Sequence, residues 1–317
     1  MKEIGGYIEF EHSNGDEYYP DLIALNCGRN CLAYIIKAKS IKKIYLPYFL
    51  CSSVSDICKK HGAEIEYYHI NERFLPEFKG CVSQNEALYI VNYYGQLSDK
   101  EIMMYKENYN NVIVDNSQAF FSKPIDDVDT LYTCRKYFGV ADGAYLKTDR
   151  ELKEKLDTDI SYSRMNFLLG RYEVGAEKFY NEYVENNKFF INEPIKYMSK
   201  LTHNIMRSID YDFIAKRRNE NFEVLNSAFS KFNKLNLIVM DGAFMYPLYL
   251  KNGSKIRKEL IDKKIFTPTL WPNVFNLCEK NSLEYDMADN ILPIPVDQRY
   301  TNRDMKYLIT EVEKCID

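Results

Sequence analysis

The feature that most constrains the fold of this chain is an alternation of apolar and amphipathic segments between residues 31 and 118. Apolar runs with strand-like composition cover residues 43–49, 64–70, 86–95 and 111–118. Helix-like segments at 31–41, 52–62 and 98–109 separate them, and Ser98 is a suitable N-cap for the last one. Because such alternation is typical of parallel sheets, we expect an α/β fold with a mostly parallel sheet flanked by helices.

The second half of the chain has a different pattern, which predicts a smaller domain. Residues 150–221 are rich in charged residues and helix formers, and residues 211–232 are typical of one long helix. Strand-like segments follow at 236–240 and 245–250, and helical ones at 254–265 and 301–316. We therefore expect a large α/β domain over residues 1–209 and a small C-terminal α+β domain over residues 210–317.

Composition and missing motifs disfavour several classes of protein. The formal net charge of -4 predicts no nucleic-acid partner. No apolar run is long enough to span a membrane and no signal-peptide core precedes residue 20, so we expect a cytoplasmic protein with no membrane partner. The eight cysteines form no CxxC pair and the four histidines are scattered, so we expect free thiols and no metal site. The GxGxxG, GxxxxGK[ST], HExxH and GxSxG patterns are all absent.

Three segments carry residues that could bind a ligand or take part in a reaction, and the first is a possible anion site. Gly28 stands where a helix is expected to begin, and the N-terminus of a helix attracts anions through its free N–H groups and its dipole. Arg29 adds a positive charge and Asn30 adds amide donors. Alternatively, Gly28 is an ordinary turn residue in the loop before the helix.

The second segment follows the strand-like run at 111–118. Asp115 ends its apolar part and Gln118 comes three residues later. At the carboxyl edge of a parallel sheet these side chains would face a ligand, where Asp115 could hold a positively charged ring nitrogen and Gln118 a neighbouring oxygen. Alternatively, Asp115 is a helix cap.

The third segment contains Lys136, which stands between two apolar runs shortly after Thr133. A lysine amine that is shielded from water and lies near other positive charge can lose its proton and form a Schiff base with an aldehyde. Alternatively, Lys136 extends its charge to solvent and pairs with Asp142 or Asp126. Together the three segments offer an anion site, a carboxylate and a Schiff-base lysine, which are the groups that pyridoxal phosphate (PLP) requires.

In their order along the chain these segments resemble the DegT/StrS-type sugar aminotransferases, a family of fold type I PLP proteins. The resemblance includes the CGRNCL phosphate loop, the IYLPYFLCSSV and VNYYGQLSD segments, and the RRNENFEVL helix. It also includes Asp115 with Gln118, and Lys136 followed by an acidic-Gly turn at Asp142. The chain departs from the family pattern at Arg29, where the family has threonine, and near Cys51, where an aromatic residue would stack on the cofactor ring. Phe49 or Tyr48 could substitute for that aromatic residue.

The resemblance implies a fold type I homodimer that transfers an amino group from glutamate to a nucleotide-linked keto sugar, in polysaccharide or related synthesis. Lys136 would hold PLP as an internal aldimine, Asp115 would keep the ring nitrogen protonated, and Gln118 would bind the ring hydroxyl. The phosphate would be held by Gly28, Arg29, Asn30 and Thr133. Two alternatives remain: another PLP-dependent reaction such as elimination or retro-aldol cleavage, and a non-catalytic protein of this fold with a binding or regulatory role.

Overall fold

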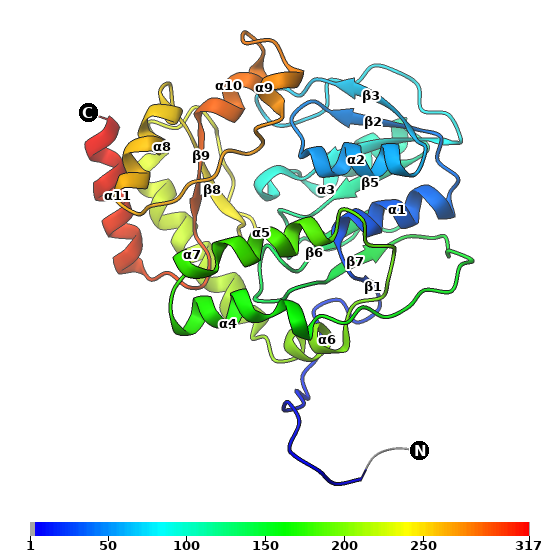
Figure 1. Cartoon of the computed structure of the whole chain (residues 1–317). Helices are drawn as coiled ribbons and strands as arrows, with labels where there is room; N and C mark the ends of the chain where they lie inside the picture. Colours follow the sequence, from blue (N-terminus) through cyan, green and yellow to red (C-terminus); the bar gives the residue numbers. More distant parts are fainter. Residues whose placement is uncertain (1–3, 317) are drawn as a thin grey trace.

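The alternating segments of the first half form one seven-stranded sheet in the computed structural model, which describes residues 4–316 (Figure 1). The strand order is β1-β7-β6-β5-β4-β2-β3, and β3, β2, β4, β5 and β6 run parallel. Strand β7 is antiparallel to β6 and β1 is antiparallel to β7. The strands are β1 (Ile23–Leu25), β2 (Lys43–Pro47), β3 (Glu64–Tyr68), β4 (Glu86–Val91), β5 (Val112–Asp115), β6 (Asp129–Thr133) and β7 (Ala144–Lys147). The predicted mostly parallel sheet is confirmed.

The helices that connect the parallel strands are also those that the sequence predicts. They are α1 (Gly28–Ala38), α2 (Ser52–Lys60) and α3 (Asp99–Asn108). Ser98 caps α3 through a capping box, in which its side chain accepts from the Glu101 N–H and Glu101 accepts from the Ser98 N–H. All four residues of β5 are buried, because helices cover both faces of a parallel sheet.

The charge-rich middle of the chain forms short helices. These are α4 (Asn166–Glu173), α5 (Tyr180–Phe189) and α6 (Lys200–Met206), with single 3-10 turns at η2 (Tyr162–Arg164) and η3 (Glu177–Phe179). In Figure 1, α4 and α6 lie below the strands and α5 runs across the view at the height of β6. None of the helices in residues 4–316 is long and apolar enough to cross a membrane.

The C-terminal part builds a second hydrophobic core around a two-stranded antiparallel sheet, to one side of the large sheet (Figure 1). Phe222, Leu225 and Phe229 from the longest helix lie in this core. The elements around this core are α7 (Tyr211–Phe229), β8 (Met245–Tyr249), α8 (Gly253–Asp262), β9 (Ile291–Pro295) and α11 (Asn302–Ile316). Two short helices of the C-terminal part, α9 (Val274–Leu277) and α10 (Leu283–Asn290), instead pack their buried side chains into the core of the large sheet. The domain boundary at residues 209 and 210 stays a prediction.

The strand predicted at residues 236–240 is wrong, because this segment has no regular structure. The partner of β8 is instead β9, which contains Pro293 and Pro295. Proline lacks the N–H that a strand donates, so it is tolerated only where one edge of the strand has no partner. A two-stranded sheet has two such edges, and the proline-rich sequence therefore concealed a strand.

We expect Phe222→Ala to destabilise the protein by about 3–5 kcal/mol, because it removes a fully buried ring that packs edge-on against Tyr246 at 5.0 Å. Urea denaturation followed by circular dichroism measures this change. The matched control is Phe232→Ala. Because Phe232 is 41% exposed, this substitution should lower the free energy of unfolding by less than about 1 kcal/mol. Equal effects of the two substitutions would contradict the assignment of this core.

Candidate functional site

The parallel pairing of β5 with β6 brings the three predicted segments to one edge of the sheet. Asp115, the last residue of β5, is paired with Leu131, and β6 ends two residues later at Thr133. Helix α1 begins against this edge, since a Cβ built on Gly28 would lie 3.9 Å from both Leu131 Cδ1 and Thr133 Cβ. That is an ordinary contact distance and Gly28 has no positive φ, so neither space nor backbone geometry requires glycine here.

Asp115 is buried and both of its carboxylate oxygens accept hydrogen bonds. Tyr89 Oη donates to Oδ2 at 2.8 Å, and the Ser117 N–H donates to Oδ1 at 2.8 Å. The second bond closes a turn and no helix follows, so the interpretation of Asp115 as a helix cap is wrong. Burial raises the pKa of Tyr89, and the nearby Asp115 carboxylate raises it further, which keeps the hydroxyl protonated as a donor.

Lys136 lies in the turn after β6 and has no carboxylate partner among residues 4–316. Its Nζ donates to Ser117 Oγ at 2.9 Å and lies 5.6 Å from the centre of the Phe244 ring. The two acidic partners considered from the sequence are engaged elsewhere. Asp126 pairs with Lys147 at 3.7 Å, and Asp142 accepts from Ser199 at 2.8 Å. The ion pairs of Lys136 with Asp142 or Asp126 are therefore wrong, while its exposed side chain agrees with the expectation that its charge extends to solvent.

The pKa of Lys136 is lowered, mainly because surrounding protein desolvates its amine. Asp115 and Cys51 act in the opposite direction, and Arg135 adds to the lowering. Lys136 is nevertheless an exposed residue, so water reaches this amine and opposes the effect of the surrounding protein. A lowered pKa increases the fraction of neutral, nucleophilic amine at neutral pH.

The N-terminus of α1 is open to an anion. The N–H groups of Gly28 and Arg29 lie in the first turn, where the helix itself supplies no acceptor. No acidic residue lies in this turn, and Cys27 at the N-cap makes no side-chain capping bond. Asn30 contributes less directly than expected, because its buried amide donates to Asn26 Oδ1 at 2.9 Å and to the Pro194 carbonyl at 2.7 Å.

Arg135 joins Arg29 at this helix end, and sequence reasoning missed it. Arg29 donates to the Asn187 carbonyl at 3.3 Å, and Arg135 donates to Asn187 Oδ1. The Arg135 guanidinium lies 4.8 Å from the centre of the Phe190 ring, and its buried Nε has no hydrogen-bond partner. Within residues 4–316 neither arginine pairs with a carboxylate, so two positive charges remain unbalanced. The only sequence signal was the position of Arg135 immediately before Lys136.

Gln118 lies on the neighbouring turn and is almost fully buried. Its Oε1 accepts from the Tyr94 N–H at 2.9 Å, at a point where Tyr94 has a left-handed φ of 54°. This bond stabilises the turn η1 (Tyr93–Gly95) that follows β4. The Gln118 amide nitrogen makes no hydrogen bond within residues 4–316, so its hydrogens are free for a ligand.

The two aromatic residues proposed to stack on a cofactor ring are packed elsewhere. Phe49 is fully buried and contacts Trp271 edge-on at 5.0 Å, and Tyr48 stacks on Tyr67 at 5.1 Å. Cys51, the N-cap residue of α2, is instead close enough to Lys136 to influence its pKa.

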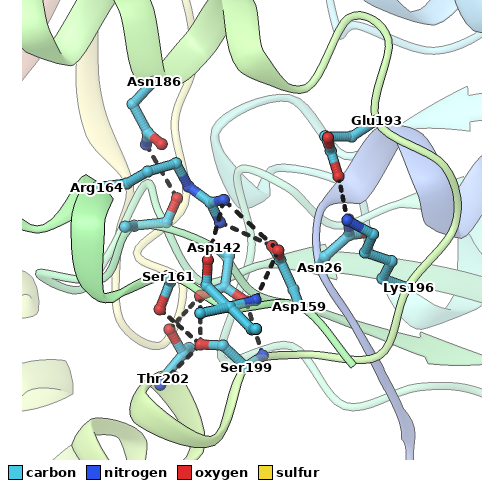
Figure 2. A network of polar contacts seen from close by, with 12 residues as sticks. Asn26, Asp142, Asp159, Ser161, Arg164, Asn186, Glu193, Lys196, Ser199 and Thr202 are labelled. Carbon is cyan, nitrogen blue, oxygen red and sulfur yellow. Dashed lines mark hydrogen bonds and ion pairs between the residues drawn. The ribbon is translucent and has the colours of Figure 1, made fainter. Parts of the chain in front are cut away.

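A buried carboxylate anchors the chain that follows Lys136 (Figure 2). Asp142 accepts from the Ser199 N–H and the Ser199 hydroxyl, both at 2.8 Å, and from the Thr202 hydroxyl. Ser199 is the N-cap of α6, so these bonds join the acidic-Gly turn to that helix. Gly143 has a φ of +112°, which explains why glycine follows Asp142.

Comparisons with known proteins support the fold. No family model and no curated protein matches the sequence. Among solved structures, the sugar aminotransferase CalS13 from Micromonospora echinospora matches with a TM-score of 0.61 and 15% identity, over 93% of this chain and 87% of its own. A DegT DnrJ EryC1 StrS aminotransferase from Brucella abortus matches with 0.63 and 12%, over 92% and 85%. NtdA from Bacillus subtilis, solved with bound cofactor PMP, matches with 0.64 and 12%, over 92% and 72%.

The chain therefore has the fold of these aminotransferases. The predicted fold type I architecture, with its mostly parallel sheet and a smaller C-terminal part, is confirmed. At 12–15% identity these matches establish the fold, and they leave the activity of this chain open.

Proposed function

We propose that this protein is a PLP-dependent aminotransferase of the DegT/StrS type and that Lys136 is its reactive amine. The observation that carries the proposal is an amine with no carboxylate partner in the described part of the chain, next to the buried Asp115 and two unbalanced arginines at the N-terminus of α1. The similar structure of NtdA holds PMP, which supports a cofactor of this class.

The residues present fit such a cofactor. A phosphate would accept from the first N–H groups of α1 and from Arg29, Thr133 and Arg135, and it would provide the missing acceptor for the buried Arg135 Nε. Asn30 would support this site indirectly, because its amide donates to the Pro194 carbonyl in the neighbouring loop. When bound, PLP supplies an aldehyde that condenses with amines and a ring that stabilises negative charge on the substrate carbon.

The chain's own residues have separable roles in this proposal. Asp115 would accept a hydrogen bond from the protonated ring nitrogen and keep it protonated, while the Tyr89 hydroxyl and the Ser117 N–H hold the Asp115 carboxylate in place. Gln118 would donate its free amide hydrogens to the ring hydroxyl. The Lys136 amine, once released by an incoming amino donor, would move a proton between the substrate and the cofactor as a general acid and base.

The substrates proposed are glutamate as amino donor and a nucleotide-linked keto sugar as acceptor, in polysaccharide or related synthesis. The support is the resemblance of the motifs and the fold shared with CalS13, a sugar aminotransferase. A cytoplasmic location accords with this role.

Lys136→Ala should abolish covalent attachment of PLP. We expect wild-type protein mixed with PLP to show a yellow absorption band, and borohydride reduction followed by peptide mapping to locate the label on Lys136. Lys147→Ala is the matched control, because Lys147 is a surface lysine paired with Asp126. Absence of the band in wild-type protein, or a label on another lysine, would overturn the catalytic proposal and favour a non-catalytic protein of this fold.

Arg135→Gln should weaken PLP and inorganic phosphate binding by about 10- to 100-fold, because a buried, charge-assisted hydrogen bond contributes about 1.5–3 kcal/mol. Isothermal titration calorimetry on folded protein measures both affinities. The control is Arg150→Gln, since Arg150 is 68% exposed and forms an ion pair with the neighbouring Asp149. Unchanged phosphate affinity in the Arg135 variant would exclude Arg135 from the anion site.

We also propose that the protein is a homodimer. Apolar side chains between residues 160 and 191 are unusually exposed, among them Tyr172, which is 93% exposed, and Leu169 and Tyr180. Such a surface is typical of an interface, and it adjoins the anion site, since Tyr183 influences the pKa of Arg135. A second copy of this chain would cover the surface and complete the wall of the site.

Sedimentation velocity at about 10 µM should show a dimer, and the double substitution of Leu169 and Tyr172 to Asp should raise its Kd at least about 100-fold, because buried charges would be unpaired. Tyr307→Asp, at a position on α11 that is 55% exposed, is the control. A wild-type monomer at this concentration would contradict the proposal.

A further inference from the structure

One buried arginine links the C-terminal part to the Lys136 turn. Arg218 belongs to α7 and is 1% exposed. Its guanidinium donates to the Ala243 carbonyl at 3.0 Å, to the Phe244 carbonyl at 3.3 Å and to the Tyr137 carbonyl at 3.4 Å. No carboxylate forms a salt bridge with it within residues 4–316. A buried cation that bonds to backbone carbonyls in this way fixes the geometry of the chain segments that supply them.

The Tyr137 carbonyl receives a second donor from the same side. Gln298 Nε2 donates to it at 2.9 Å, and Gln298 Oε1 accepts from Arg218 Nε at 3.0 Å. The guanidinium also lies 4.4 Å from the centre of the Tyr137 ring. Residues of the C-terminal part therefore contact both the backbone and the side chain of Tyr137, the residue after Lys136.

A third residue, Asn221, fixes the segment that carries Gln298 against α7. Asn221 lies three positions after Arg218 on α7, and its Nδ2 donates to the carbonyls of Val296 and Tyr300, both at 3.1 Å. These residues flank Gln298. The Arg-x-x-Asn pattern of the RRNENF helix thus has a physical reason, because one residue holds the lysine turn and the other holds the segment that carries Gln298.

Arg218 also positions a side chain beside the amine. It holds the Phe244 carbonyl, and the Phe244 ring lies 5.6 Å from Lys136 Nζ and 5.8 Å from the Tyr137 ring. The lysine side chain is flexible, and its only hydrogen bond within residues 4–316 is the one to Ser117 Oγ. The position of the amine therefore depends on the backbone of its turn and on the ring packed beside it.

We propose that Arg218, acting with Gln298, is a positioning residue that fixes the Lys136 amine relative to Asp115 and Ser117. The inference rests on the proposed function, in which Lys136 is the reactive group. The charged and titratable groups that act on this amine are Asp115, Cys51 and Arg135, each from a different element. Loosening the turn would let the amine move away from the surrounding protein that desolvates it, so the lowered pKa of Lys136 would rise toward its ordinary value.

Competitive labelling with acetic anhydride tests this inference. The relative rate of acetylation of Lys136, with the 79% exposed Lys255 as internal standard, is measured by mass spectrometry between pH 6 and 11. The variants are Arg218→Lys, which retains the charge, and Gln298→Ala, which leaves the guanidinium intact. Arg217→Lys is the matched control, because the neighbouring Arg217 pairs with the surface residue Glu220 and lies 5.7 Å from the centre of the exposed Phe213 ring.

We expect both variants to lower the labelling of Lys136 at pH 8 at least about threefold, which corresponds to a rise of about half a unit in its pKa. The control should match wild-type protein. Wild-type labelling in folded Gln298→Ala would overturn the inference, and this variant decides the question if Arg218→Lys fails to fold. Acetylation needs no cofactor, so failure of the proposed function, seen as no PLP attachment to wild-type Lys136, is a separate result.

Discussion

The parallel pairing of β5 with β6 is the constraint on which the candidate site depends. It puts Asp115 beside Leu131, two residues before the end of β6, and the turn with Lys136 follows directly. Carboxyl ends of parallel strands meet at one edge of a sheet, so a carboxylate and a lysine distant in sequence come together there. Helix α1 packs against the same edge, and its free N–H groups therefore point to the same place.

The charge at this edge is unbalanced in a way that favours an anionic ligand. Arg29 and Arg135 contribute two positive charges, and Lys136 contributes an amine with a lowered pKa, near one carboxylate, Asp115. Burial lowers the pKa of Arg135, which records the cost of removing this cation from water. The side chain and carbonyl of Asn187 and the ring of Phe190 offset part of that cost. In the proposed holoenzyme, a phosphate would supply the remaining partner.

The lysine turn is held from two directions, which distinguishes it from an ordinary surface loop. Asp142 joins the chain after the turn to α6, and Arg218 joins the turn itself to the C-terminal part. Arg218 donates to backbone carbonyls and, among residues 4–316, forms no salt bridge, so the contact specifies geometry without a buried ion pair. A movement of the C-terminal part relative to the large sheet would consequently change the position of Lys136.

Local pattern was sufficient for the elements whose signals are short-range. The helix capped by Ser98 and the strand that ends at Asp115 were both predicted and found. The strand expected at 236–240 was not, because apolar composition alone does not say which segment pairs with β8. Two prolines in β9 concealed the true partner, since the rule against proline in strands depends on which edges are paired.

The sequence by itself determined which chemical groups are present and in what order: a helix start at Gly28, a carboxylate at Asp115 and an amine at Lys136. Only the tertiary structure decided which groups meet. It packed Arg135 beside Arg29, engaged Phe49 and Tyr48 elsewhere, and brought Arg218 to the carbonyl of Tyr137, 81 residues away. These contacts depend on how strands and helices pack, and no short-range pattern encodes a hydrogen bond between segments so distant in the chain.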